Sequence, residues 1–157
     1  MEGTRRCTQR GLGGPTRVIA VKQVDIRVRW ADMDAYQHVN NAVYLNYFEE
    51  ARDLVMVGMF GPEALDFVLA HVDIDFRNEL TQDDGVIQVL SRVTGYGRSS
   101  VRSREMVRKA DGTLSAEGGA VVVPRDTASG RSRPLTEDEI ARIEAAMQDD
   151  RAAGYDF

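Results

Sequence analysis

The chain has 157 residues, of which 43% are apolar and 29% are charged, the size and composition of one ordinary globular domain. A formal net charge of −5 excludes the basic surface of a protein that follows nucleic-acid phosphates, so no nucleic-acid partner is expected. The only cysteine, Cys7, excludes a disulfide framework, and with two histidines, His38 and His71, no metal site is predicted.

The sequence also bears on location and domain boundaries. No apolar run approaches the roughly 20 residues that span a membrane, and the arginines near the N-terminus lack the apolar stretch of a secretory signal. We therefore expect a cytoplasmic protein without a membrane span. Residues 1–17 are rich in glycine and arginine and poor in apolar side chains, which predicts a disordered tail. Residues 18–157 are predicted to form a single domain.

Hydrophobic periodicity predicts a strand, a long helix and then a run of strands. Apolar and polar residues alternate over 24–30, which is typical of a half-buried strand. Residues 42–58 have helical spacing and carry apolar side chains on several faces, so other elements are expected to wrap around this helix. The later elements are a short helix within 63–69, a strand at 71–77, a turn at 83–85, strands at 86–94, 99–109 and 113–123, an interruption at 95–97 and a hairpin turn at 111–112.

A terminal helix closes the chain. Thr136 and Glu139 have the spacing of a capping box, and residues 137–139 place three acidic side chains in the first turn, where the helix dipole favours them. One long helix followed by consecutive antiparallel strands is an α+β arrangement, in which the helix packs on one face of the sheet.

The residues with catalytic potential gather in the polar segment that precedes the long helix: Asp32, Asp34, His38, Asn40 and Asn41. A helix start offers unpaired N–H groups and a positive dipole, so amides near Asn41 can face a developing oxyanion. A carboxylate on the loop can deprotonate a water molecule. The chain has no G-x-S-x-G motif, and its one cysteine lies in the tail, so the pattern suits acyl transfer to water without a serine or cysteine nucleophile.

One string of residues carries a family likeness: Arg29-x-x-Asp32-x-Asp34-x-x-x-His38-Val39-Asn40-Asn41-x-x-Tyr44, continued by Tyr47, Glu49, Glu50, Ala51 and Arg52. It resembles the hotdog-fold acyl-CoA thioesterases, in the branch that includes 4-hydroxybenzoyl-CoA thioesterase. The order of elements is similar over about residues 18–123. The resemblance implies a curved antiparallel sheet wrapped around the long helix, and a homodimer or homotetramer with active sites at subunit interfaces. It further implies hydrolysis of an acyl-CoA to a carboxylic acid and free coenzyme A, with no cofactor.

The same resemblance assigns roles to residues. Asp34 matches the catalytic carboxylate, which acts as general base or as nucleophile on the thioester carbonyl, and the backbone N–H of Asn41 matches the group that polarises this carbonyl. The family usually has glycine where this chain has Gln37, a change that restricts the loop backbone. Asn40 is expected to cap the helix. His38 either orients the turn or contacts water or the carbonyl.

Further residues are predicted from their positions. Asp32 is expected to be structural, Tyr44 to border the substrate pocket, and Tyr47 to lie in the core. Glu49 and Arg52 are three residues apart and are expected to form an ion pair, with Glu49 or Glu50 as the reserve catalytic carboxylate. Coenzyme A phosphates are expected to meet hydroxyl, amide and guanidinium groups after the glycine interruption, with a second choice of arginines further on. These residues are Arg98, Ser99 and Ser100, and then Arg131 and Arg133.

Two other functions are weighed against hydrolysis. A non-catalytic acyl-CoA-binding module is compatible with Gln37 and with the many roles that one fold supports. An enoyl-CoA hydratase or dehydratase is the less favoured alternative, because those relatives pair a histidine with a carboxylate in a glycine- and proline-rich setting that His38 lacks.

Overall fold

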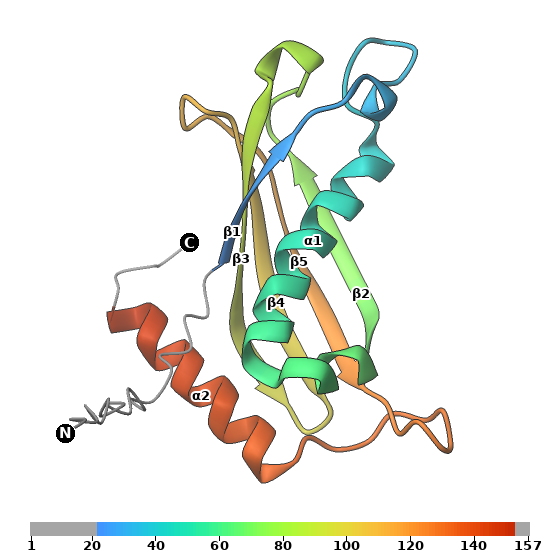
Figure 1. The fold of residues 1–157 in the computed structure, drawn as a ribbon, viewed down its shortest axis with the longest axis vertical. Coiled ribbons are helices and arrows are strands. Elements are labelled where there is room, and N and C mark those ends of the chain that lie inside the picture. Colours follow the sequence, from blue (N-terminus) through green and yellow to red (C-terminus); the bar gives the residue numbers. More distant parts are fainter. Residues whose placement is uncertain (1–21, 153–157) are drawn as a thin grey trace, which may run out of the picture.

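The computed structural model describes residues 22–152 and contains one five-stranded antiparallel sheet (Figure 1). The predicted tail 1–17, with Cys7, lies outside the described residues. The sheet has the order β1-β3-β4-β5-β2. Its strands are β1 Lys22–Arg27, β2 Phe67–Phe76, β3 Val86–Gly97, β4 Ser100–Arg108 and β5 Leu114–Pro124. The predicted α+β arrangement is confirmed, with β1 and β2 at the two edges of the sheet.

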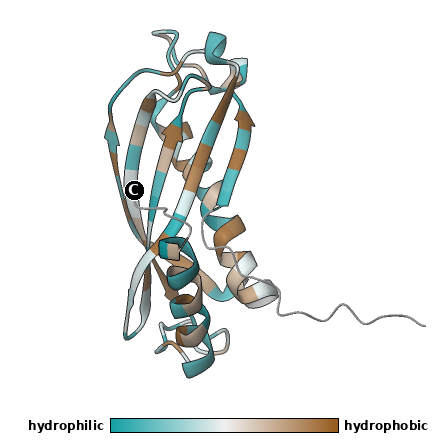
Figure 2. Ribbon diagram, turned by 90° about the vertical axis from the view of Figure 1, so that its left-hand side faces the viewer, coloured by the Kyte–Doolittle hydropathy of each residue, from teal (hydrophilic) through white to brown (hydrophobic). Residues whose placement is uncertain are grey.

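Two helices pack on the same face of this sheet. The long helix α1, Asn41–Phe60, lies across the face, and α2, Glu137–Ala152, packs beside its C-terminal half (Figure 1). The predicted wrapping of α1 is incomplete in the chain: Leu54 is 46% exposed and Val57 is 52% exposed, on a flank that the sheet does not cover. Figure 2 shows how hydrophobic and hydrophilic residues alternate along the strands, as expected for a sheet with one covered face.

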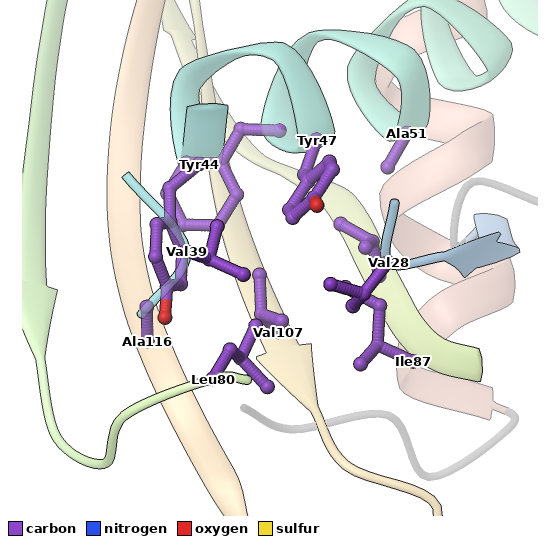
Figure 3. Close-up of a cluster of buried hydrophobic side chains, with 11 residues drawn as sticks. Val28, Val39, Tyr44, Tyr47, Ala51, Leu80, Ile87, Val107 and Ala116 are labelled. Carbon is purple, nitrogen blue, oxygen red and sulfur yellow. The ribbon is translucent and has the colours of Figure 1, made fainter. Parts of the chain in front are cut away.

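The core consists of two apolar clusters. One surrounds the first half of α1 and includes Tyr47, Phe48 and Ile87 (Figure 3). The other lies where the end of α1 meets α2 and includes Met59 and Ile143. A polar layer separates them on α1, β3 and β4, and it consists of Arg52 on α1, Ser91 on β3, and Ser103 and Glu105 on β4. Each of these residues stands in the chain between members of the two clusters.

Several element boundaries differ from the predictions. The first strand ends at Arg27, and residues Trp30–Asp32 form a short 3-10 helix instead of continuing the strand. The short helix predicted within 63–69 is a 3-10 helix at Gly61–Asp66, and residues from Phe67 onward already belong to β2.

The glycine segment 95–97 does not interrupt the sheet, because β3 continues to Gly97 with an irregularity between Val93 and Gly95. A Cβ at Gly95 would lie 2.9 Å from the guanidinium of Arg102, so the glycine leaves room for this side chain from β4. The capping box at the terminal helix is confirmed: Thr136 N donates to Glu139 Oε2 at 2.7 Å, and Glu139 N donates to Thr136 Oγ1 at 3.2 Å.

Candidate active site

Asp32 organises the loop that precedes α1. Its carboxylate is 1% exposed and accepts hydrogen bonds from Arg29 N at 2.8 Å, from the Arg29 guanidinium at 2.7 Å and from the Tyr47 hydroxyl at 2.9 Å. Burial acts to raise the pKa of Asp32, but the hydrogen bonds from Arg29 and Tyr47 outweigh it and hold this pKa below its usual value. Asp32 therefore anchors the loop to α1, which is the structural role that the sequence predicts.

Asp34 closes a tight turn with its own side chain. Its Oδ1 accepts hydrogen bonds from Tyr36 N at 2.8 Å and from His38 N at 3.2 Å, and Asp34 N donates to His38 O at 2.8 Å. Gln37 adopts a left-handed backbone with φ of 66°, a conformation that glycine adopts without strain. Asp34 Oδ2 accepts no hydrogen bond from any residue in 22–152, so one carboxylate oxygen remains available.

The start of α1 leaves one backbone donor free. Asn40 Oδ1 accepts a hydrogen bond from Ala42 N at 2.9 Å, which confirms Asn40 as the N-cap, and Asn40 O accepts from Val43 N at 2.8 Å. The N–H of Asn41 has no acceptor within the part of the chain that the structure describes. This donor, at the positive end of the helix dipole, can stabilise negative charge on an oxygen atom.

The two predicted catalytic groups line neighbouring pockets and not a single one. Asp34 lines a pocket of about 470 Å³ together with Gln37 and Thr81. Asn41 lines a second pocket, of about 250 Å³, together with His38 and Leu80. Residues 37 and 38 on the loop, and residues 80 and 81 on the β2–β3 linker, are consecutive, so the two pockets adjoin.

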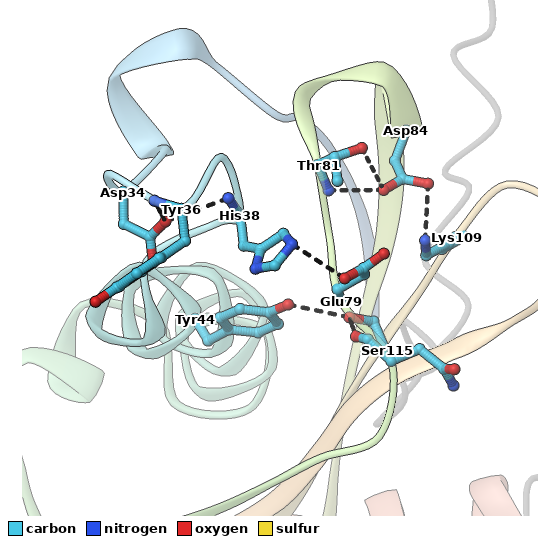
Figure 4. A network of polar contacts seen from close by, with 10 residues as sticks. Asp34, Tyr36, His38, Tyr44, Glu79, Thr81, Asp84, Lys109 and Ser115 are labelled. Atoms are coloured by element: carbon cyan, nitrogen blue, oxygen red, sulfur yellow. Dashed lines mark hydrogen bonds and ion pairs between the residues drawn. The ribbon is translucent and has the colours of Figure 1, made fainter.

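The second pocket contains a carboxylate that no sequence motif indicates. His38 Nε2 lies 3.0 Å from Glu79 Oε2, on the linker between β2 and β3 (Figure 4). Glu79 stands in a polar segment with no motif around it, and only the fold brings it to His38. Tyr44 borders the same pocket, and its place at the substrate stays a prediction; its hydroxyl lies 3.1 Å from Ser115 Oγ, and burial raises the pKa of Tyr44.

The expected ion pair between Glu49 and Arg52 is wrong. Arg52 is only 5% exposed and points to the fully buried Glu105, with 3.7 Å between Arg52 Nη1 and Glu105 Oε1. Burial raises the pKa of Glu105, although Ser103 and Arg52 oppose this effect. Glu49 and Glu50 are exposed, and Glu49 lines a third pocket, of about 220 Å³, with Asp53.

The residues predicted to meet coenzyme A phosphates lie at the far end of the sheet from Asp34. Arg98 and Ser99 form the turn from β3 to β4, and Ser100 is the first residue of β4 (Figure 1). Arg131 is exposed at the same end, but Arg133 holds Glu139 through hydrogen bonds of 2.9 and 2.8 Å, so its guanidinium is engaged in capping α2. In one copy of the chain, the structure does not bring these residues to the loop.

Within residues 22–152, no cluster of three histidine, cysteine, aspartate or glutamate side chains could hold a metal ion. In this same range, no helix combines the length and the apolar character needed to cross a membrane.

Comparisons with known proteins agree with this architecture. The family model of the thioesterase-like superfamily matches residues 28–148. The chain is 29% identical over 104 residues to the long-chain acyl-CoA thioesterase FadM of Escherichia coli (strain K12), a match that covers 60% of this chain and 76% of FadM.

Solved structures give the same picture. A thioesterase from Thermus thermophilus, crystallised with coenzyme A and Zn, is 34% identical, with a TM-score of 0.74, over 83% of this chain and 96% of that one. A DHNA-CoA thioesterase from Staphylococcus aureus has a TM-score of 0.72 over 87% of this chain and 97% of that one; at 14% identity, this likeness shows the fold alone. The predicted hotdog fold is confirmed.

Proposed function

Since the chain belongs to the thioesterase-like superfamily and is a thioester hydrolase, we propose that it hydrolyses acyl-CoA to a carboxylic acid and free coenzyme A. The observation that carries the proposal is the juxtaposition at the start of α1: a free N–H at Asn41 beside a loop that holds Asp34 with one free carboxylate oxygen. Two similar proteins, one named as an acyl-CoA thioesterase and one crystallised with coenzyme A, support this substrate class.

The proposed chemistry uses both neighbouring pockets. The thioester lies over residues 34–41 with its carbonyl oxygen near Asn41 N–H, and a water molecule lies near Asp34 Oδ2. Asp34 takes one proton from the water molecule while the water oxygen attacks the carbonyl carbon. The backbone N–H of Asn41 stabilises the resulting oxyanion. The C–S bond then breaks, and the sulfur receives the proton from Asp34. The products are the acid and the thiol, and Asp34 is again ionised.

We propose that the enzyme acts as a homodimer. β3 has 12 residues, so about 40 Å separates the loop from the turn of Arg98. The pantetheine arm of coenzyme A, which joins the thioester to the phosphates, is about as long as five extended residues, or about 17 Å. It is too short to reach from the loop to the turn of Arg98 on one copy of the chain. If two copies pair antiparallel along the edge strand β2, the loop of one copy lies beside the turn of the other. The exposed apolar side chains of Val57 and Leu69, which line one pocket beside that edge, support this surface.

The test of the activity is a thiol-release screen over short-chain, long-chain and aromatic acyl-CoA substrates. We expect release of free coenzyme A with saturation kinetics for at least one of them. Saturable binding without thiol release across the panel would favour the acyl-CoA-binding module instead. An enoyl-CoA in the same panel, followed spectroscopically for hydration, is expected to show none.

The dimer has a separate test. Val57→Asp places a charge on the exposed flank of α1 and is expected to convert the protein from dimer to monomer in light scattering and to raise the KM for acyl-CoA. A wild-type protein that is monomeric and fully active would contradict the proposal that two copies share the site. The cytoplasmic location stays a prediction.

A further inference from the structure

The pair formed by His38 and Glu79 joins two segments that are far apart in the chain. His38 lies in the loop before α1, and Glu79 lies in the linker from β2 to β3. The side chains are 47% and 64% exposed, and 3.0 Å separates His38 Nε2 from Glu79 Oε2 (Figure 4). An exposed pair of this kind contributes little to folding stability. Its position beside the helix start therefore invites a functional explanation.

The backbone on both sides of the pair holds it in place. Val39 N donates to Leu80 O at 2.8 Å, and both side chains are buried in the core cluster under the first half of α1. On the other side of Glu79, Asn78 N donates to Ser115 O at 3.0 Å, and Asn78 Nδ2 donates to Leu114 O at 2.7 Å. Glu79 thus stands between two fixed residues, and its carboxylate is presented to His38 by the fold.

His38 is tied to the candidate base as well. The backbone N–H of His38 donates a hydrogen bond to Asp34 Oδ1, and the backbone carbonyl of His38 accepts one from Asp34 N, so the two residues share one turn. Both His38 and Glu79 line the pocket of about 250 Å³ that contains Asn41. His38 Nδ1 has no hydrogen-bond partner in the described chain, so this nitrogen is the part of the imidazole that remains available to a ligand.

We propose that Glu79 is a positioning residue that acts through His38. At 3.0 Å from His38 Nε2, the carboxylate can accept a hydrogen bond from Nε2–H; this bond favours the imidazole tautomer with its proton on Nε2 and leaves Nδ1 as an acceptor. Held in this way, Nδ1 accepts a hydrogen bond from the water molecule that attacks the thioester, and so aims its oxygen at the carbonyl carbon. The proton that leaves the water still goes to Asp34. The inference rests on the proposed function and assigns a role to Glu79 within that site.

The test compares four enzymes in the thiol-release assay: the wild type, Glu79→Ala, His38→Ala and the double variant. Loss of a partner that orients a reacting group typically lowers activity 10- to 100-fold, so we expect Glu79→Ala to reduce kcat about tenfold with KM nearly unchanged. Because Glu79 acts through His38, the double variant is expected to be no slower than His38→Ala alone. Glu79→Gln keeps an oxygen acceptor and is expected to recover most of the loss.

The chain offers a matched control. Arg142 and Asp138, on α2, form another exposed ion pair, with 2.8 Å between Arg142 Nε and Asp138 Oδ2 and side chains that are 43% and 70% exposed. Asp138→Ala is expected to leave kcat and KM unchanged, because neither residue lines the two pockets at the loop or belongs to the edge strand β2. Equal thermal midpoints for all variants exclude unfolding as the cause of any loss.

The outcomes separate this inference from the function on which it rests. An active wild type with an unaffected Glu79→Ala, or with losses in the two single variants that multiply in the double variant, overturns the role of Glu79 and leaves the hydrolysis intact. A wild type that releases no thiol from any acyl-CoA overturns the proposed function, and this inference with it.

Discussion

Removing one partner of the buried pair between Arg52 and Glu105 is expected to destabilise the protein strongly. Arg52 Nη1 lies 3.7 Å from Glu105 Oε1, and the two residues are 5% and 0% exposed. Opposite charges at this separation interact by about 4 kcal/mol at an effective dielectric constant of about 20. Arg52→Met leaves the carboxylate buried without its cation, a change that typically costs about 3–5 kcal/mol. We expect the free energy of unfolding to fall by about that amount.

The double variant distinguishes the effect of an unpaired buried charge from the effect of lost side-chain packing. Arg52→Met combined with Glu105→Met removes both charges and fills the same layer with apolar atoms, so we expect it to lie within about 2 kcal/mol of the wild type. Asp138→Asn is the control, because its pair with Arg142 on α2 is exposed and contributes less than about 1 kcal/mol. Urea unfolding followed by far-UV circular dichroism measures each value, provided that the m-value stays constant.

The pH dependence of the Arg52→Met variant supplies a second check. Burial already raises the pKa of Glu105, and loss of the arginine raises it further. A carboxyl group whose pKa is higher in the folded than in the unfolded state binds protons preferentially when folded, so stability rises as pH falls through the folded pKa towards about 4.3. The deficit of the variant is therefore expected to shrink between pH 8 and pH 5. Equal free energies of unfolding for the single and double variants, or a deficit that is independent of pH, would show that Arg52 does not stabilise an ionised Glu105.

Two more predictions concern the loop before α1. Gln37→Gly is expected to stabilise the protein by about 0.5–1 kcal/mol, because relief of the left-handed backbone exceeds the added freedom of the unfolded chain; a lower thermal midpoint contradicts this. The low pKa of Asp32 means that its ion pair and hydrogen bonds contribute stability above about pH 4, which is lost as pH falls through the lowered pKa. Asp32→Asn is expected to flatten the acid limb of the stability curve between about pH 4 and pH 2; an unchanged limb would show that Asp32 contributes nothing there.

Features encoded in adjacent residues were predictable from the sequence. The helical spacing gave α1 nearly its full length, and the oxygen-bearing side chains of Asn40 and Thr136 marked the starts of both helices. The polar loop with Asp34 was also visible, because its residues are close in the chain. Such signals depend on interactions over a few residues, which a pattern can represent.

Features that depend on tertiary contacts were not predictable in this way. Arg52 lies within three residues of Glu49, Glu50 and Asp53 on α1. The structure nevertheless pairs it with Glu105, which is 53 residues away in the sequence and belongs to strand β4. Glu79 reaches His38 only because Leu80 pairs with Val39. The separation of about 40 Å between Arg98 and Asp34 follows from the direction of β3, which no local motif reveals.

One substitution tests whether the Asp34 carboxylate carries out the hydrolysis. Asp34→Asn keeps an Oδ1 that accepts the hydrogen bonds from Tyr36 N and His38 N, so the turn is expected to fold as before. Asp111→Asn is the matched control, since Asp111 also accepts a backbone hydrogen bond in a turn, from Thr113 N at 2.9 Å, and lines none of the three pockets. In the thiol-release assay on the best acyl-CoA substrate, we predict that Asp34→Asn lowers kcat by at least about 100-fold while Asp111→Asn matches the wild type. Turnover by a folded Asp34→Asn enzyme at the wild-type rate would contradict the account.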